Sequence, residues 1–179
     1  MTIRDDRRSA AIGLMADHLL EKGLAGASLR PMAAAAGISD RMLLYYFTDK
    51  DDVLAATLGE VAQRLALMLE AGAPTQMPFR ALLSVLWSSM RIPTLMPYIS
   101  LWLEVAAASS RGVEPYRRIG GAIADGFLAW TAQRLLVEDE ADRPHLAALL
   151  LSTFDGLAML DAVGRSAQAD AAVAAWARL

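Results

Sequence analysis

The chain has 179 residues, of which 55% are hydrophobic and none is cysteine, and its formal net charge is -3 at pH 7. The absence of cysteine excludes disulfide frameworks, thiolate zinc sites and cysteine nucleophiles, and it is compatible with a reducing cytoplasm. The net charge alone does not favour nucleic-acid binding, which depends on Lys and Arg at phosphates, but residues 1–50 carry seven basic and six acidic side chains.

The apolar content predicts a large buried surface and no membrane span. Mean hydropathy is +0.33. The longest uncharged stretch, Ile92 to Leu103, contains Pro93 and Pro97 and is shorter than the roughly 20 residues that a transmembrane helix needs. We therefore expect the apolar excess to lie in a core, a pocket or a subunit interface.

The first 20 or so residues have the spacing of an amphipathic helix over 2–21, which Gly23 ends. Arg4, Arg7 and Arg8 lie in its first turns. These arginines either form a basic arm that reaches phosphate or the minor groove, or belong to a solvated helical turn.

The next stretch, 28–50, predicts a helix-turn-helix. Ser28 is a suitable N-cap for a helix that runs through Ala36, and Gly37 supplies the left-handed residue that ends it. Ser39 then caps a second helix over 40–47. The turn between the two helices is therefore expected to be short and rigid.

The two helices divide into a buried and an exposed side. The faces that should meet are apolar and contain Leu29, Met32, Ala33, Ala36, Ile38, Leu43 and Phe47. The exposed side should carry Asp40, Arg41, Met42, Tyr45 and Tyr46. Such a surface suits a DNA major groove, where Arg binds guanine, Met contacts a thymine methyl and Tyr reaches phosphate. The alternative is a plain antiparallel helix pair.

Residues 23–54 also resemble the DNA-binding domain of the TetR (tetracycline repressor) family. The resemblance lies in Gly23, Ser28, Ala33, the turn at 35–39, Leu43, Tyr45, Phe47, Lys50 and Leu54. It covers about the first third of the chain. It implies an all-α, dimeric transcription regulator whose C-terminal domain binds a small molecule.

Transferred residue by residue, the resemblance makes Ser39 to Tyr46 the recognition helix. It implies DNA contacts at Ser28, Arg30, Ser39, Asp40, Arg41, Met42, Tyr45, Tyr46 and Lys50. The chain departs from the family at Met42 and Leu44, where the family often has Thr and Tyr. Tyr45, Tyr46 and Lys50 should therefore contribute more of the phosphate positioning.

The remaining chain reads as further helices, and we divide it into a DNA-binding domain, 1–50, and an effector-binding and dimerisation domain, 51–179. Asp49 and Asp52 have capping-box-like spacing at the start of a long helix to about Ala71. This helix should connect the two domains as a lever. A loop over 72–78 precedes helices expected at 79–91, 97–110, 116–137, 144–163 and 167–178.

The helix at 144–163 is apolar on more than one side, with Leu149 and Leu157 assigned to one face and Phe154 and Ala158 to another. One face can meet the domain's own core, and the other needs a partner. The family resemblance implies a four-helix homodimer interface formed with the helix at 116–137. The alternative is a central core helix in a monomer.

No catalytic constellation or cofactor motif is recognisable, and His18 and His145 lack the spacing of metal ligands. We therefore predict no enzyme activity and no cofactor. Aromatic and Met side chains of the C-terminal domain are candidates for lining a ligand pocket, namely Trp87, Met90, Tyr98, Trp102, Phe127, Trp130 and Phe154. Arg91 and Glu104 are among the polar groups that could orient a guest.

Together these features predict a cytoplasmic, ligand-responsive regulator that binds double-stranded operator DNA. In this hypothesis it is a homodimeric repressor on a palindromic operator, released by a small hydrophobic or aromatic effector. The alternative is a helical small-molecule-binding or protein-interaction module that binds no DNA.

Overall fold

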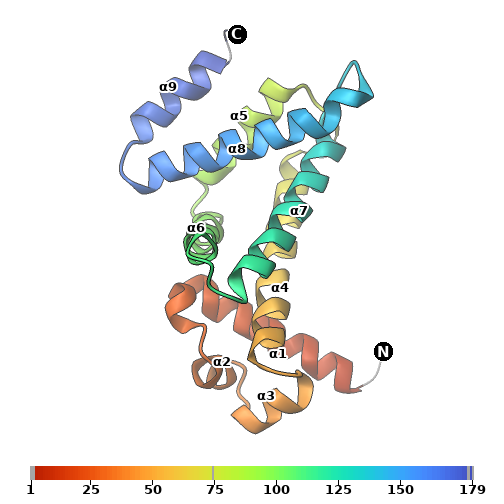
Figure 1. The fold of residues 1–179 in the computed structure, drawn as a ribbon, viewed down its shortest axis with the longest axis vertical. Coiled ribbons are helices and arrows are strands. Elements are labelled where there is room, and N and C mark those ends of the chain that lie inside the picture. Colours follow the sequence, from red (N-terminus) through yellow and green to blue (C-terminus); the bar gives the residue numbers. More distant parts are fainter. Residues whose placement is uncertain (1–2, 74, 177, 179) are drawn as a thin grey trace. The chain divides into compact units, whose positions relative to one another are not determined.

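The computed structural model describes residues 3–73, 75–176 and 178, and every element named in this part of the chain is helical (Figure 1). The all-α prediction is confirmed. The α-helices are α1 (Ile3–Lys22), α2 (Leu29–Ala35), α3 (Asp40–Tyr46), α4 (Lys50–Gly72), α5 (Phe79–Met90), α6 (Met96–Ser110), α7 (Tyr116–Arg134), α8 (Arg143–Ala162) and α9 (Ser166–Trp176). Two 3-10 helices are η1 (Gly23–Gly26) and η2 (Glu140–Asp142).

The helices form two compact units. The N-terminal unit comprises the chain up to Arg64 and Ser100–Gly121, and the C-terminal unit comprises Leu65–Ile99 and the chain from Ala122. Helices α4, α6 and α7 therefore contribute residues to both units. The predicted division after residue 50, between a DNA-binding domain and an effector-binding and dimerisation domain, stays a prediction.

The helix-turn-helix is present in the N-terminal unit, where α2 contacts both α1 and α3 (Figure 1). Gly37 has φ +67° and ends α2, and the Ser39 hydroxyl accepts a hydrogen bond from the Met42 amide at 3.2 Å. Ala33 of α2 and Leu43 of α3 are fully buried. Ser28 occupies the N-cap position of α2, but its side chain makes no capping hydrogen bond, so that part of the prediction is wrong.

The predicted cap of α4 is confirmed in detail. The Asp49 carboxylate accepts from the Asp52 amide at 2.8 Å, and the Asp52 carboxylate accepts from the Thr48 amide at 2.9 Å. Both amides would otherwise lack partners at the helix start. The direction in which α4 leaves the helix-turn-helix is therefore set by two reciprocal hydrogen bonds.

Arg64 connects α4 to α1 within the N-terminal unit. Its guanidinium donates to Glu60 at 2.7 Å, to Asp17 at 2.6 Å and to the Gly13 carbonyl at 3.2 Å. Burial lowers the pKa of Arg64, but the hydrogen bonds to the two carboxylates outweigh it and raise that pKa above its ordinary value. The guanidinium thus remains charged while it holds the two helices together.

Glu104 connects α6 to the turn that follows α1. Its carboxylate accepts a hydrogen bond from the Leu24 amide at 2.7 Å. Gly23, the preceding residue, has φ +63°, and a Cβ placed there would clash with a Glu104 carboxylate oxygen. A side chain at position 23 would therefore have a strained backbone and would also have to displace the Glu104 carboxylate from the Leu24 amide.

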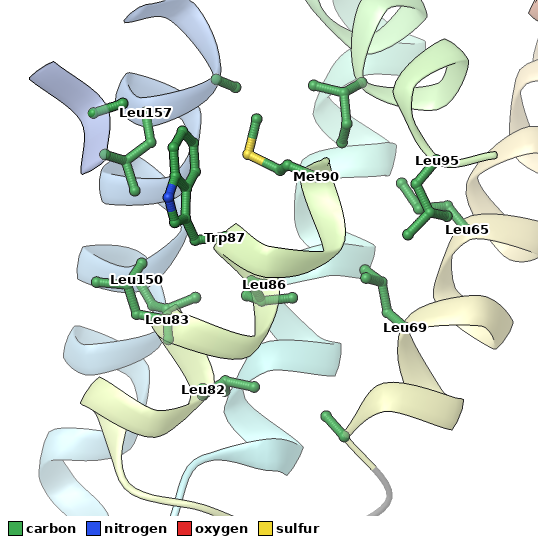
Figure 2. Close-up of a cluster of buried hydrophobic side chains, with 14 of the residues drawn as sticks. Leu65, Leu69, Leu82, Leu83, Leu86, Trp87, Met90, Leu95, Leu150 and Leu157 are labelled. Carbon is green, nitrogen blue, oxygen red and sulfur yellow. The ribbon is translucent and has the colours of Figure 1, made fainter. Parts of the chain in front are cut away.

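The C-terminal unit is built around a cluster of buried side chains from α4, α5, α8 and α9. In Figure 2, Leu83 and Trp87 of α5 face Leu150 and Leu157 of α8. Helices α5, α8 and α9 contact one another pairwise. The core of this unit therefore depends on α8, which supplies buried residues against two neighbouring helices.

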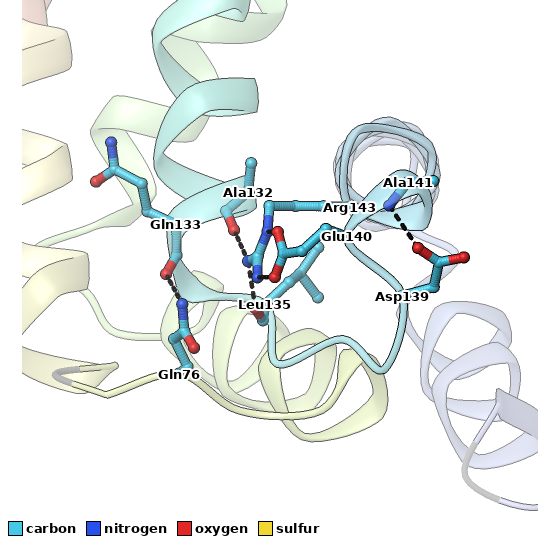
Figure 3. Close-up of polar contacts among 8 residues, drawn as sticks. All are labelled: Gln76, Ala132, Gln133, Leu135, Asp139, Glu140, Ala141 and Arg143. Atoms are coloured by element: carbon cyan, nitrogen blue, oxygen red, sulfur yellow. Dashed lines mark hydrogen bonds and ion pairs between the residues drawn. The ribbon is translucent and has the colours of Figure 1, made fainter.

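Helix α7 ends at Arg134, three residues earlier than predicted, because the chain then pairs with the loop before α5. Met77 donates to the Arg134 carbonyl and accepts from the Leu136 amide, both at 2.9 Å. Arg143 satisfies the carbonyls of Ala132 and Leu135 at 2.7 and 2.6 Å and pairs with Glu140 (Figure 3). These bonds replace the last helical turn expected from the sequence.

Helix α8 has one buried and one exposed face. Ala147, Leu150, Leu157 and Ala158 are buried, whereas Leu149 is 41% exposed, so the predicted grouping of Leu149 with Leu157 is wrong. The segment Glu140–Ala162 is the one helix among the described residues that is long and apolar enough to cross a membrane, a property that the core helix of a soluble protein also has.

We expect Gly23→Ala to destabilise the protein more than Gly37→Ala does. Both glycines have a left-handed backbone, which costs an L-residue about 1 kcal/mol. Only at Gly23 does the new methyl group displace Glu104 from the Leu24 amide, since a Cβ at Gly37 has no heavy atom within 4 Å. The additional loss should be about 1 kcal/mol. Urea unfolding followed by circular dichroism measures both variants, and equal losses would contradict this account.

Candidate functional site

The outer face of α3 exposes the side chains predicted to read DNA. Asp40 and Arg41 are exposed, Met42 is 39% exposed and Tyr45 is 59% exposed. Tyr46 is half-buried. This short helix therefore presents a guanidinium, a thioether and a phenol to solvent, while its opposite side is sealed by the core.

Burial beneath α3 explains why this face is held in place. Leu43 is fully buried, and Phe47, directly after the helix, is 3% exposed. The Ser39 cap leaves its hydroxyl hydrogen free to donate, because its oxygen acts as the acceptor for Met42. A polar group at the helix start thus remains available to a phosphate.

The other predicted contacts also lie in the N-terminal unit. Ser28 and Arg30, at the start of α2, are exposed, as is Lys50, the first residue of α4. All nine predicted DNA-binding residues therefore belong to one compact unit. Their role in binding DNA stays a prediction.

Six of the seven residues predicted to line a ligand site gather in the C-terminal unit. Trp87 and Met90 belong to the buried cluster, and four partly buried side chains pack against it, Tyr98, Phe127, Trp130 and Phe154. Trp102 is half-buried and belongs to the N-terminal unit. The aromatic content of the C-terminal unit is thus concentrated around a single apolar cluster.

The Trp87 indole is joined to two charged side chains. Its N–H donates to Asp170 of α9 at 2.8 Å, and Arg91 pairs with the same carboxylate at 2.9 Å. The Arg91 guanidinium also lies over the indole, 4.8 Å from the ring centroid. The hydrogen bond from Trp87, together with Arg91, lowers the pKa of Asp170, so this carboxylate stays ionised at neutral pH.

A second arrangement of the same kind joins α4 to α7. The Trp130 indole donates to Glu70 at 3.2 Å, and Arg134 forms an ion pair with Glu70. The hydrogen bond from Arg134 is the main cause of the lowered pKa of Glu70. Each tryptophan therefore has a fixed orientation, with its N–H on a carboxylate and its ring next to an arginine.

Sequence reasoning missed these partners because they are far apart in the chain. Trp87 and Asp170 are 83 residues apart, and Trp130 and Glu70 are 60 apart. The structure also places Glu104, considered as an orienting group for a ligand, on the Leu24 amide. No local sequence signal distinguishes these carboxylates from those that have no hydrogen-bond partner.

Residues 10–57 match the family model described as bacterial regulatory proteins, tetR family. The match includes α2, α3 and the intervening turn, together with the start of α4. A search of curated proteins found no sequence that matches this chain.

Solved structures resemble the chain over nearly its full length. A TetR-family transcriptional regulator from Cytophaga hutchinsonii is 18% identical, with a TM-score of 0.73, over 98% of this chain and 93% of that one. The multidrug binding protein EbrR, complexed with proflavin, is 24% identical, with a TM-score of 0.71, over 96% and 98%. A Saccharomonospora viridis protein in complex with choline is 19% identical, with a TM-score of 0.69, over 96% and 95%.

Proposed function

We propose that this chain, whose residues 10–57 match the model of the tetR family of bacterial regulatory proteins, is a homodimeric, ligand-released repressor. In this proposal it acts in the cytoplasm on a palindromic operator. The observation that carries the proposal is the exposed face of α3, which is capped by Ser39 and anchored by buried Leu43 in a region that matches the family model.

The proposed DNA contacts divide into positioning and reading groups. Ser28, Arg30 and Lys50 would contact phosphates, which fix the register of the domain on the duplex. Arg41 and Met42 would face base edges, where a guanidinium can bind guanine and a thioether can contact a thymine methyl. Tyr45 and Tyr46 would supplement the phosphate contacts.

The proposed dimer forms through α7 and α8. The exposed face of α8 is a helical stripe of Ala148, Leu149, Ser152, Gly156, Met159 and Val163. Exposed Ala122, Gly126 and Ala129 give α7 a surface that permits close approach. Two copies of this face around a two-fold axis would form a four-helix interface and cover the apolar side chains of α8.

Effector control would act through the distance between the two recognition helices. A palindromic operator presents successive major grooves about 34 to 36 Å apart, so a change in spacing weakens both half-site contacts. A ligand that prefers the mis-spaced dimer by about 1 to 3 kcal/mol would lower operator affinity roughly 5- to 150-fold. Movements of α4 would be transmitted to α1 through the hydrogen bonds of Arg64, and movements of α6 to the turn after α1 through the hydrogen bond of Glu104.

The proposed effector is a hydrophobic or aromatic small molecule. The aromatic side chains packed against the apolar cluster of the C-terminal unit support this class. Structurally similar proteins form complexes with proflavin, an aromatic cation, and with choline, a quaternary ammonium cation, so we choose these two organic cations as first probes.

The remaining alternative is a helical binding module without DNA recognition. Such a module would keep the aromatic cluster and the exposed face of α8, and changes on α3 would leave its activity intact. The exposed, capped recognition face favours the regulator.

We expect Lys50→Ala and Tyr45→Ala each to weaken binding to a duplex selected by the wild-type protein from a random pool. Loss of a phosphate contact at Lys50 should also reduce the slope of log affinity against log salt by roughly 0.9 per protomer. Arg80→Ala, which removes an exposed charge from α5, serves as the control. Mobility-shift titrations at several salt concentrations give both quantities, and equal binding by the doubly substituted protein would contradict the site.

We expect Leu149→Glu combined with Met159→Glu to convert the dimer into monomers, because four carboxylates would be buried in the interface. Light scattering coupled to size exclusion measures the mass in solution. Leu67→Glu, at an apolar side chain of α4 that is 65% exposed, is the matched control and should remain dimeric. A wild-type protein that is monomeric at high concentration would contradict the proposed assembly.

We expect proflavin to raise the thermal unfolding temperature of the wild-type protein and to weaken its binding to the selected duplex. At a ligand concentration of 100 times Kd the stabilisation should be about 2.7 kcal/mol. Phe127→Ala should reduce the shift, and Leu136→Ala, at an exposed position, should not. A flat response to proflavin, choline and chemically diverse apolar compounds would count against the effector.

A further inference from the structure

Two arginines of α1 lie against aromatic side chains at the C-terminal end of α3. The guanidinium carbon of Arg4 is 4.8 Å from the centroid of the Tyr45 ring, and that of Arg8 is 4.6 Å from the centroid of the Phe47 ring. Arg4 and Arg8 are four residues apart, so they share one face of α1. Both distances are those of cation–π contacts.

Arg4 also binds the main chain of Tyr45. Its guanidinium donates a hydrogen bond to the Tyr45 carbonyl oxygen at 3.1 Å. This carbonyl lies in the last turn of α3, which ends at Tyr46, and the last carbonyls of a helix have no donor within the helix. A cation at this end is also favoured by the helix dipole. One side chain therefore holds both the ring and the backbone of a single residue.

The Tyr45 ring has little other support. It is 59% exposed and makes an edge-on contact with the Tyr46 ring, with the two centroids 5.5 Å apart. An exposed tyrosine near a helix end can adopt several rotamers. A ring that contacts DNA in only one of them binds more tightly when that rotamer is already populated.

We propose that Arg4 is a positioning residue for DNA recognition, which orients the Tyr45 phenol and stiffens the end of α3 without needing to neutralise a phosphate itself. The inference rests on the proposed function, because it assigns Arg4 a role in the binding that Tyr45 is proposed to perform. This role differs from both alternatives that the sequence left open for Arg4, a basic arm that reaches phosphate and a solvated helical turn.

The first test is the affinity of Arg4→Ala for the selected duplex over a range of salt concentrations. We expect affinity to fall roughly 3- to 10-fold, as for the loss of an exposed cation–π contact with its hydrogen bond. The salt slope should stay unchanged, because no phosphate contact is lost. Arg7→Ala removes the same charge from another exposed position of α1 and controls for the change in net charge.

The second test is a double-substitution cycle. In a Tyr45→Ala background, Arg4→Ala should cost less affinity than in the wild-type protein, because the ring is gone and only the hydrogen bond to the main-chain carbonyl of residue 45 remains to be lost. Arg7→Ala should show no such coupling to Tyr45. Arg4→Lys should recover only part of the affinity, since an ammonium can lie over the ring but lacks the planar fork that also reaches the carbonyl. Circular dichroism and thermal unfolding verify that each variant keeps its fold.

The outcomes separate this inference from the proposed function. If Arg4→Ala lowers the salt slope by about 0.9 per protomer and its effect is undiminished without the Tyr45 ring, Arg4 contacts phosphate directly and the positioning role is overturned. Wild-type affinity in Arg4→Ala also overturns it, while DNA binding by the wild-type protein would still support the regulator. If the wild-type protein binds no duplex, both fail together.

Discussion

Close packing of α2 against α3 is the constraint on which the recognition face depends. Ala33 of α2 and Leu43 of α3 are fully buried, and Gly37 turns the chain between the two helices with a left-handed backbone. A larger side chain at Ala33 would separate the helices, and a shift of α3 would move every side chain on its outer face together. The exposed residues of α3 can be polar and variable because the buried ones determine where the helix lies.

In the N-terminal unit, hydrogen bonds of polar side chains join further segments in addition to this apolar packing. Arg64 joins α4 to α1, Glu104 joins α6 to the turn after α1, and Arg4 joins α1 to the end of α3. Each bond links segments that are distant in the chain, and two of them involve helices that also belong to the C-terminal unit. In the proposed mechanism, these directional contacts transmit small displacements of α4 and α6 to the helix-turn-helix.

The C-terminal unit also combines apolar packing with side-chain hydrogen bonds, here at two tryptophans. Trp87 and Trp130 bring large apolar surfaces to the cluster and place their N–H groups on Asp170 and Glu70. The carboxylates have lowered pKa values because these donors and the neighbouring arginines favour the charged form. Tryptophans fixed in this way provide rigid aromatic surface, which suits the planar, hydrophobic effector that we propose.

The sequence by itself determined the helical fold, the turn at Gly37, the cap of α4 by Asp49 and Asp52, and the family of the N-terminal domain. These features depend on residues close together in the chain, whose spacing and backbone preferences are visible without a structure. Only the tertiary structure decided that α7 ends at Arg134, that Leu149 lies on the exposed face of α8, and that Glu104 and Arg4 hold other segments. Each of these depends on a partner far away in the chain: Leu136 bonds to Met77, and Arg4 is 41 residues from Tyr45. The periodicity of the sequence cannot identify such partners, because a side chain that contacts a distant segment and one that contacts only solvent can have the same helical spacing.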